Sequence, residues 1–228
     1  MKRAFLILSF LIVLISCKKR TVQLPETANK DITEVLDVSP IYMFYDEEND
    51  SVDFNRSNMI GTTNWLVNID KRLTLKQILL HLKYLQEKRN KDGMHKNDAA
   101  RNYFTCSNPE IQNLAFIDFT DVVYHDEPII DFITDYYSDQ PENKTKLLLN
   151  FTESDSLYIS DQLSIEGFKK DEIENVLIKK TSETDSSMEL FLTFNENLSF
   201  QDYIYYKTIL LEAKENNVII NVDEFIYN

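Results

Sequence analysis

A chain of 228 residues with 43% hydrophobic and 12% aromatic side chains is long enough to bury one large core or two small ones. Its 38 acidic residues outnumber its 24 basic ones, which gives a net charge of -14. This charge repels phosphates and anionic head groups and so excludes nucleic acid and anionic lipid as direct ligands of the folded part. The three isolated glycines, Gly61, Gly93 and Gly167, exclude glycine-rich phosphate loops.

The first 17 residues have the form of a bacterial lipoprotein signal. Residues 1–3 are basic at Lys2 and Arg3, and residues 4–16 are apolar but shorter than the roughly 20 residues that span a bilayer. Leu14-Ile15-Ser16-Cys17 resembles a lipobox, in which the cysteine is lipidated and becomes the new N-terminus. We predict a signal peptide at 1–16 and lipidation of Cys17. The alternatives are an ordinary signal peptide with an incidental cysteine and a short membrane anchor.

Cleavage before Cys17 leaves 22 basic against 38 acidic residues, or -16. Lys18 stands where an aspartate favours retention in the inner membrane, so we predict an outer-membrane anchor facing the periplasm. Residues 17–35 contain Pro25 and show no periodicity, which predicts a tether between lipid and domain. With Cys17 lipidated, Cys106 is the remaining thiol and no internal disulfide can form.

Residues 36–144 are expected to form a first unit. A strand at 41–45 leads into the acidic turn 46–50, which lacks the glycine and glutamate of a calcium-binding EF-hand and is interpreted as a solvated hairpin turn. The turn leads to a second short run near Val52 and Phe54, and the next strand covers 65–69. Thr74-Leu75-Lys76-Gln77 then has the form of a capping box and starts a helix that ends near Lys88.

The stretch 89–113 contains Gly93 and Pro109 and is interpreted as a long inserted loop, a common place for binding functions. Its His95 and Cys106 suggest a metal site, but a second pair at ligand spacing is missing, so a surface histidine beside a half-buried cysteine is the preferred interpretation. We predict no metal, no cofactor and no catalytic residue.

A strand at 114–119, a helix that starts near Pro128 and a strand at 147–149 complete the first half and open a second unit, 145–228. In this unit, Met188 to Val222 is the clearest stretch, because an alternating strand, an amphipathic helix that follows Ser199 and an apolar strand predict a parallel strand-helix-strand unit.

Residues 116–137 align with residues 191–212 at a constant offset of 75, so that Phe116 meets Phe191. Upstream, 65–82 resembles 157–177 in the order strand, turn, helix. We interpret these likenesses as an internal duplication. The expected fold class is α/β (α+β), with two tandem two-layer units that each carry two helices on one face of a mixed sheet.

The second unit resembles the periplasmic domain of the ExbD/TolR family of biopolymer-transport proteins over about residues 145–226. The likeness rests on a strand, a polar turn around Asp161, a helix, and a strand that passes through Asn195-Glu196-Asn197-Leu198-Ser199-Phe200 into a helix and a final strand. It implies an envelope domain that binds partners and often pairs with a second copy. The family also has a membrane-spanning helix with an aspartate for protons. The apolar segment here is short and has no acid, so no proton-carrying residue is carried over.

Candidate catalytic side chains have plainer interpretations. His81 is a helix-flank residue, and the acids beside His125 cap the helix at Pro128. The tyrosines of the two helices are core or helix-flank residues, and any that is exposed is a candidate contact residue. They are Tyr136, Tyr137, Tyr203, Tyr205 and Tyr206.

The sequence therefore predicts a non-enzymatic cell-envelope lipoprotein that acts by protein–protein contacts, accessory to an envelope transport or integrity complex. Its expected partners are the membrane through Cys17 and envelope proteins or a second copy, without nucleic acid or small-molecule substrate. The alternative is an acidic periplasmic inhibitor or immunity protein that binds a basic partner.

Overall fold

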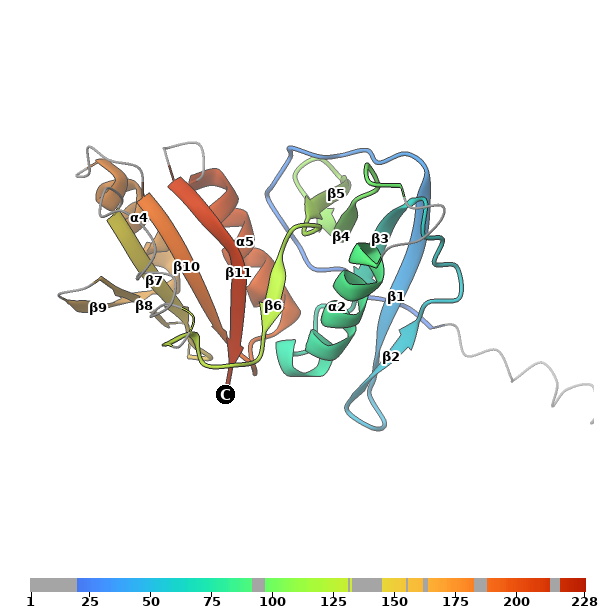
Figure 1. Ribbon diagram of the computed structural model, residues 1–228, viewed down its shortest axis with the longest axis horizontal. Coiled ribbons are helices and arrows are strands. Elements are labelled where there is room, and N and C mark those ends of the chain that lie inside the picture. Colours follow the sequence, from blue (N-terminus) through green and yellow to red (C-terminus); the bar gives the residue numbers. More distant parts are fainter. Residues whose placement is uncertain are drawn as a thin grey trace, which may run out of the picture.

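The computed structural model describes residues 20–91, 97–130, 132, 145–154, 156–161, 164–182, 188–213 and 218–228. These residues form two mixed β-sheets and three α-helices (Figure 1). The predicted α+β class with two sheet units is confirmed.

Sheet 1 has the strand order β2-β1-β3-β4-β5. β1, β3 and β4 are parallel, and the edge strands β2 and β5 are antiparallel to their neighbours. Helix α2 connects β3 to β4 and begins at the predicted capping box of Thr74 and Gln77. The elements are β1 Val38–Asp46, β2 Ser51–Asn55, β3 Asn64–Ile69, α2 Leu75–Asn90, β4 Asn102–Asn108 and β5 Asn113–Asp118.

Sheet 2 has the strand order β6-β11-β10-β7-β8-β9. β10, α5 and β11 form the predicted parallel strand-helix-strand unit. β6 comes from the first half of the chain but pairs with β11, so sheet 2 contains strands from both halves. The elements are β6 Val123–His125, β7 Thr145–Phe151, β8 Ser156–Ser160, β9 Ile165–Lys169, the short 3₁₀ helix η1 Lys170–Glu172, α4 Ile173–Ser182, β10 Met188–Asn195, α5 Phe200–Ala213 and β11 Val218–Tyr227.

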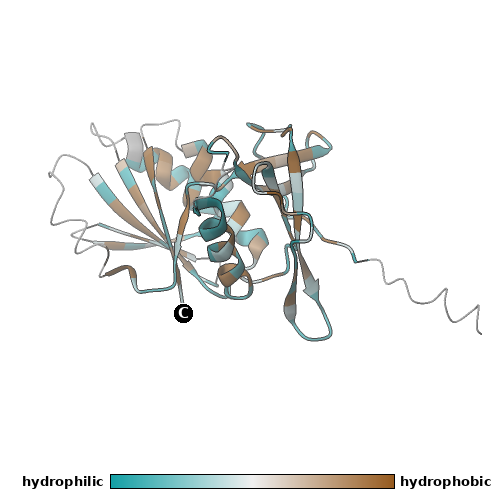
Figure 2. Cartoon of the chain, turned by 45° about the vertical axis from the view of Figure 1, so that its right-hand side comes forward, coloured by the Kyte–Doolittle hydropathy of each residue, from teal (hydrophilic) through white to brown (hydrophobic). Residues whose placement is uncertain are grey.

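Helices α2 and α5 lie between the two sheets (Figure 1). α5 is apolar over most of its length, whereas α2 has a hydrophilic side (Figure 2). The Phe104 ring of β4 contacts Phe200 and Tyr203 of α5, at centroid distances of 5.2 and 6.1 Å. One continuous cluster of buried side chains includes both sheets and α2, α4 and α5, so the two units share a single core.

The two units meet through a reciprocal backbone contact. Thr74, the N-cap of α2, and Ser199, just before α5, form an antiparallel bridge, and their numbers differ by 125 (199 minus 74). Every bond beside the bridge has a counterpart at the same offset, which is the pattern of a two-fold axis. The N–H to carbonyl pairs are Leu75 to Leu198 (2.9 Å), Phe200 to Leu73 (2.7 Å), Lys76 to Glu196 (2.7 Å) and Gln201 to Lys71 (3.2 Å).

The predicted offset of 75 is wrong. It equates β5, an edge strand, with β10, a central strand. At an offset of 125, β3 and α2 correspond to β10 and α5. Their neighbours then correspond by their place in the sheet, because the order β2-β1-β3-β4 matches β8-β7-β10-β11. Any strand followed by a helix has the same apolar periodicity, so periodicity alone does not fix which pair is equivalent.

The stretch 89–113 is not a loop throughout, because it contains β4 between β3 and β5. Gly93 and Pro109 flank this strand rather than interrupt it. Three buried residues in succession, Phe104 to Cys106, leave no clear alternation, which is why the strand pattern is weak in the sequence. Of the helix expected near Pro128, residues 129, 130 and 132 are helical and residues 131 and 133–144 lie outside the described residues.

The predicted tether is packed against the fold where it is described. Residues 20–32, here called the N-terminal arm, contact both units. The Thr27 N–H donates to the Ser107 carbonyl of β4 at 3.0 Å, and the Thr27 hydroxyl lies 2.7 Å from the Thr208 hydroxyl of α5. The Phe116 N–H of β5 donates to the Ile32 carbonyl at 2.9 Å. The arm therefore spans the junction between the units.

Asp70, directly after β3, holds the arm and the turn into α2. Its fully buried carboxylate accepts bonds from the Arg72 guanidinium, at 2.9 and 3.0 Å, and from the Gln23 N–H at 3.2 Å. Burial raises the pKa of Asp70, but the bonds from Arg72 and from the backbone N–H groups of Gln23 and Arg72 outweigh burial and lower the pKa.

Because the folded-state pKa of Asp70 lies below the unfolded value of about 3.9, its charge stabilises the fold above about pH 4. This contribution is lost as the pH falls through the folded-state pKa. We expect Asp70→Asn, which introduces the residue found at the equivalent Asn195, to lower the urea midpoint at pH 7 and to flatten its fall below pH 4. If the urea midpoint of the variant falls below pH 4 as steeply as that of the wild type, this role of Asp70 is contradicted.

Candidate functional site: a charged cleft between the sheets

A cleft of about 330 Å³ opens between the two units. Sheet 1 contributes Arg101, Asp118 and Asp121 from the ends of β4 and β5. Sheet 2 contributes Lys207 of α5 and Glu224 of β11. Asn29 and Asp31 of the N-terminal arm also line it. The cleft thus brings together charged side chains that are far apart in the sequence.

The sheet 2 wall is a buried charged cluster. Lys207 and Glu224 form an ion pair and are 6% and 0% exposed. The second Glu224 oxygen accepts a bond from the Tyr203 hydroxyl at 2.6 Å, and that hydroxyl lies 3.3 Å from the Tyr124 hydroxyl of β6. Tyr203 and Lys207 are four residues apart, so α5 presents both on one face. Burial, and then the charge of Glu224, raises the pKa of both tyrosines well above the usual value.

The equivalent positions of sheet 1 are apolar. At the offset of 125, Tyr203 and Lys207 correspond to Ile78 and Leu82 of α2, which are fully or almost fully buried. In sheet 1, Phe104 of β4 pairs with Val67 of β3. In sheet 2, Glu224 of β11 pairs with Leu192 of β10, which is the residue equivalent to Val67. Phe104 therefore corresponds to Glu224. The fold therefore does not require charge at these positions. Buried ion pairs seldom stabilise more than apolar packing does, so this cluster is a candidate for function.

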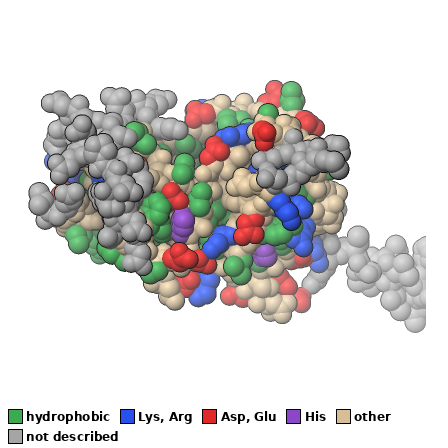
Figure 3. Space-filling model, in the orientation of Figure 1, with side chains coloured by type: hydrophobic (Ala, Val, Ile, Leu, Met, Phe, Trp, Pro, Cys, Tyr) green, Lys and Arg blue, Asp and Glu red, His purple; other side chains and the backbone are tan. Residues whose placement is uncertain are grey.

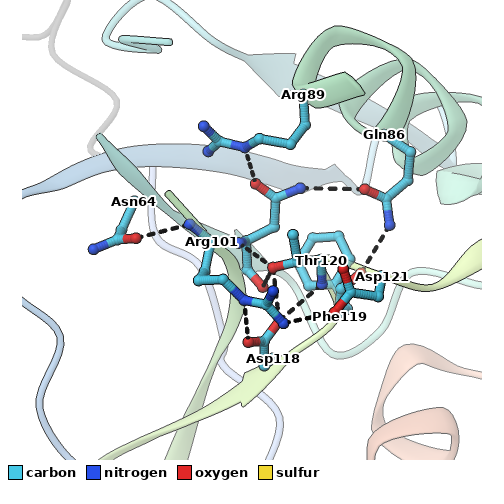
Figure 4. Close-up of polar contacts among 9 residues, drawn as sticks. Asn64, Gln86, Arg89, Arg101, Asp118, Phe119, Thr120 and Asp121 are labelled. Atoms are coloured by element: carbon cyan, nitrogen blue, oxygen red, sulfur yellow. Dashed lines mark hydrogen bonds and ion pairs between the residues drawn. The ribbon is translucent and has the colours of Figure 1, made fainter. Parts of the chain in front are cut away.

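The sheet 1 wall is a more exposed network (Figure 4). The Arg101 guanidinium donates to Asp118 and Asp121, at 2.8 Å each. The Arg101 N–H donates to the Asn64 side chain at 2.8 Å, which fixes the start of β4 beside β3. Thr120 bonds Asp118 and accepts the Asn102 N–H, both at 2.7 Å. Each charge on this wall is thus paired within it.

Behind this wall, Arg89 at the end of α2 is buried, and no carboxylate of the described residues pairs with it (Figure 4). It donates to Asn102 at 2.8 Å and to the Gly61 and Thr63 carbonyls at 2.9 and 3.1 Å. Its guanidinium lies 3.7 Å from the Trp65 ring centroid. Burial lowers the pKa of Arg89 to about 10. Arg89 therefore joins α2, the 61–63 turn and β4.

We expect Arg89→Met to lower the free energy of unfolding by about 3 kcal/mol, because three buried acceptors lose a charged donor. Urea unfolding followed by Trp65 fluorescence measures this. Arg101→Met is the control: Arg101 is half-buried and pairs with surface acids, so its loss should cost about 1 kcal/mol or less. Equal losses for both variants would contradict the assignment.

The structure separates the side chains that the sequence suggested as metal or catalytic candidates. Cys17 and His95 lie outside the described residues. Cys106 is fully buried in β4 rather than half-buried as expected, and burial raises the pKa of its thiol strongly. Within the described ranges, no three histidine, cysteine or acidic side chains gather as metal ligands.

The histidines and tyrosines occupy different surroundings. The His81 ring lies 4.6 Å from the Phe54 ring, and burial, then Arg56, lowers its pKa. His125 is 2.6 Å from Asp223 and stacks on Phe225. Tyr203 and Tyr206 are core residues, Tyr205 is half-buried, and Tyr136 and Tyr137 lie outside the described residues. Around α2 and β6, acidic and basic side chains mix rather than form a patch of one sign (Figure 3).

Arg101, Lys207 and Glu224 are not among the residues predicted from the sequence. A signal for Lys207 exists, because it lies between apolar residues on the buried stripe of α5, at Tyr203 and Leu210. Glu224 lies in a strand whose pairing with β10 shifts register between Leu190 and Leu192, so its inward orientation does not follow from simple alternation. The walls carry charged hydrogen-bonding groups, and their chemistry is that of a polar binding cleft.

A scan of protein-family models finds no match to the chain, and searches of curated proteins and of solved structures find none either. The fold and the cleft define a two-sheet α+β protein with pseudo-symmetric units. Among the described helices, none is long and apolar enough to cross a bilayer.

Proposed function

We propose that this protein is a non-enzymatic lipoprotein of the bacterial cell envelope that acts through protein–protein contacts, accessory to an envelope transport or integrity complex. The observation that carries the proposal is the docked N-terminal arm. Arg20, three residues after the proposed lipid at Cys17, already contacts Phe44 and Asp53 of sheet 1. A lipid there would hold the folded body directly at the membrane and leave its other surfaces for partners.

The element order of the second unit supports an ExbD/TolR-like domain. β7, β8, α4, β10, α5 and β11 follow the order that the likeness implies, with β9 added after β8. The reciprocal contact at Thr74 and Ser199 supports pairing of two such units within one chain. These points concern shape alone, and the proton-carrying role of the family is not proposed.

The test is isolation from bacterial membranes under gentle detergent. Wild-type chain with its anchor should return with envelope proteins, and the matched Cys17→Ser chain should carry no lipid, keep residues 1–16 and lose those proteins. Return of the wild-type chain alone, as a monomer, would count against action by protein contacts. Processing of Cys17→Ser to the same N-terminus as the wild-type chain would count against the anchor.

The second candidate function is an acidic inhibitor of a basic protein. The β1–β2 hairpin favours it, because its turn projects from the body (Figure 1) and has exposed Glu47, Glu48 and Asp50. Replacing Glu47 and Glu48 by glutamine should weaken binding to a basic partner such as lysozyme or a cationic envelope protein at low salt. Binding that is indifferent to both salt and these substitutions would exclude this candidate.

A further inference from the structure

The outer face of sheet 1 carries an apolar stripe along β1. Ile41 and Met43 are fully buried in the core, so their neighbours in the strand face outward. These outward residues are Val38, Pro40, Tyr42 and Phe44, all half-buried or exposed and none charged. The Tyr42 and Phe44 rings stack at 5.5 Å. At about 3.3 Å per residue the stripe is about 20 Å long.

The equivalent strand of sheet 2 is more polar. Met43 of β1 pairs with Ile69 of β3, and Phe151 of β7 pairs with Phe194 of β10. Phe194 is equivalent to Ile69, so β7 corresponds to β1. The outward residues of β7 are Lys146, Leu148 and Asn150, in place of Val38, Pro40 and Tyr42. The fold thus accepts polar side chains at these positions. The apolar stripe of β1 is therefore not a requirement of the sheet.

The described chain begins at one end of this stripe. The Arg20 guanidinium lies 6.0 Å from the Phe44 ring centroid and pairs with Asp53, the neighbour of Phe44 on β2. Cys17 is three residues earlier, and an extended chain spans at most about 3.6 Å per residue. Three residues of chain reach at most about 11 Å from Arg20.

We propose that the outer face of sheet 1 rests on the membrane that the Cys17 lipid inserts into. This inference rests on the proposed lipoprotein function and adds the orientation of the body. Aromatic side chains with a polar tip, such as Tyr42, favour the membrane–water interface. The acidic turn at 46–50 lies beside the same end of β1, so the contact suits zwitterionic lipid and is weakened by anionic lipid.

This orientation has a consequence for partners. The β1–β2 hairpin lies at the lipid surface, where a soluble basic partner has poor access. Sheet 2 and α4, at the opposite side of the molecule in Figure 1, face away from the membrane. Partner contacts therefore fall on the sheet 2 side.

The test couples the chain from Cys17 onward to a maleimide lipid in phosphatidylcholine vesicles. Cys106 is buried and has a raised pKa, so Cys17 is the reactive thiol. Hydroxyl-radical footprinting, read by mass spectrometry, then compares coupled with free chain. We expect a several-fold loss of oxidation at Tyr42 and Phe44 and no change at Tyr158, which is 45% exposed on β8. Phe44→Asp should reduce the protection of Tyr42, whereas Tyr158→Asp should not.

Protection of Tyr158 instead, or of neither side, would overturn the orientation. Because the coupling is chemical, the result does not depend on lipidation in cells. If the chain is not lipidated in cells but shows the expected footprint, the proposed function is wrong and the orientation stands. If the chain is lipidated but Tyr42 and Phe44 are not protected from oxidation, the orientation is wrong and the proposed function stands.

Discussion

Glu224→Leu is expected to lower the free energy of unfolding by about 3–5 kcal/mol, because it leaves the Lys207 ammonium buried without its partner. Lys207 is 6% exposed and its charge is compensated by Glu224 at the base of the cleft. The Tyr203 hydroxyl loses its carboxylate acceptor in the same variant and keeps only its contact with Tyr124. Urea unfolding at pH 7 measures the loss.

The double variant Lys207→Met/Glu224→Leu should recover most of that stability. It replaces the pair by apolar side chains of similar volume, as Leu82 and Phe104 do at the equivalent positions. Lys83→Met is the control, because Lys83 and Asp126 form a partly exposed pair whose loss should cost about 1 kcal/mol or less. A double variant as unstable as Glu224→Leu would show that the apolar comparison between the units is wrong.

Phe200→Ala is expected to lower the free energy of unfolding by about 3–5 kcal/mol. The loss should destabilise both units together. Phe200 is fully buried at the start of α5 and contacts Phe104 of sheet 1 and Tyr203 of its own helix. The single tryptophan, Trp65, lies in β3 of sheet 1. Its fluorescence therefore reports unfolding of the unit that does not contain the substitution.

If the two units share one core, the Trp65 transition of Phe200→Ala moves to lower urea together with the circular dichroism transition. Leu75→Ala, at the equivalent position of α2, is the matched variant and should shift both signals in the same way. A Trp65 transition that stays at the wild-type midpoint while circular dichroism shifts would show that the units unfold independently.

The sequence predicts local structure best where one pattern dominates. Leu75 to Leu85 on α2 and Met188 to Val222 around α5 have regular apolar periods and distinct ends, and both elements are found where expected. β4 and β9 were not predicted. Three buried residues in succession hide the alternation of β4, and β9 (Ile165–Lys169) lies where a helix was expected after the turn at Asp161.

Relations between distant segments are much less visible in the sequence. The offset of 125 is fixed by backbone bonds at Leu75 and Phe200, which carry no side-chain signature. The charged cleft depends on a register shift before Glu224 and on β6 joining the second sheet. Neither follows from periodicity, so the site needs the three-dimensional arrangement.

The most direct test of the central claim is mass spectrometry of the N-terminal peptide of the chain isolated from bacterial envelopes. We predict that this peptide begins at Cys17 and carries acyl chains on it. An unmodified peptide, or a chain that keeps residues 1–16, would contradict the lipoprotein assignment and the orientation that depends on it in cells.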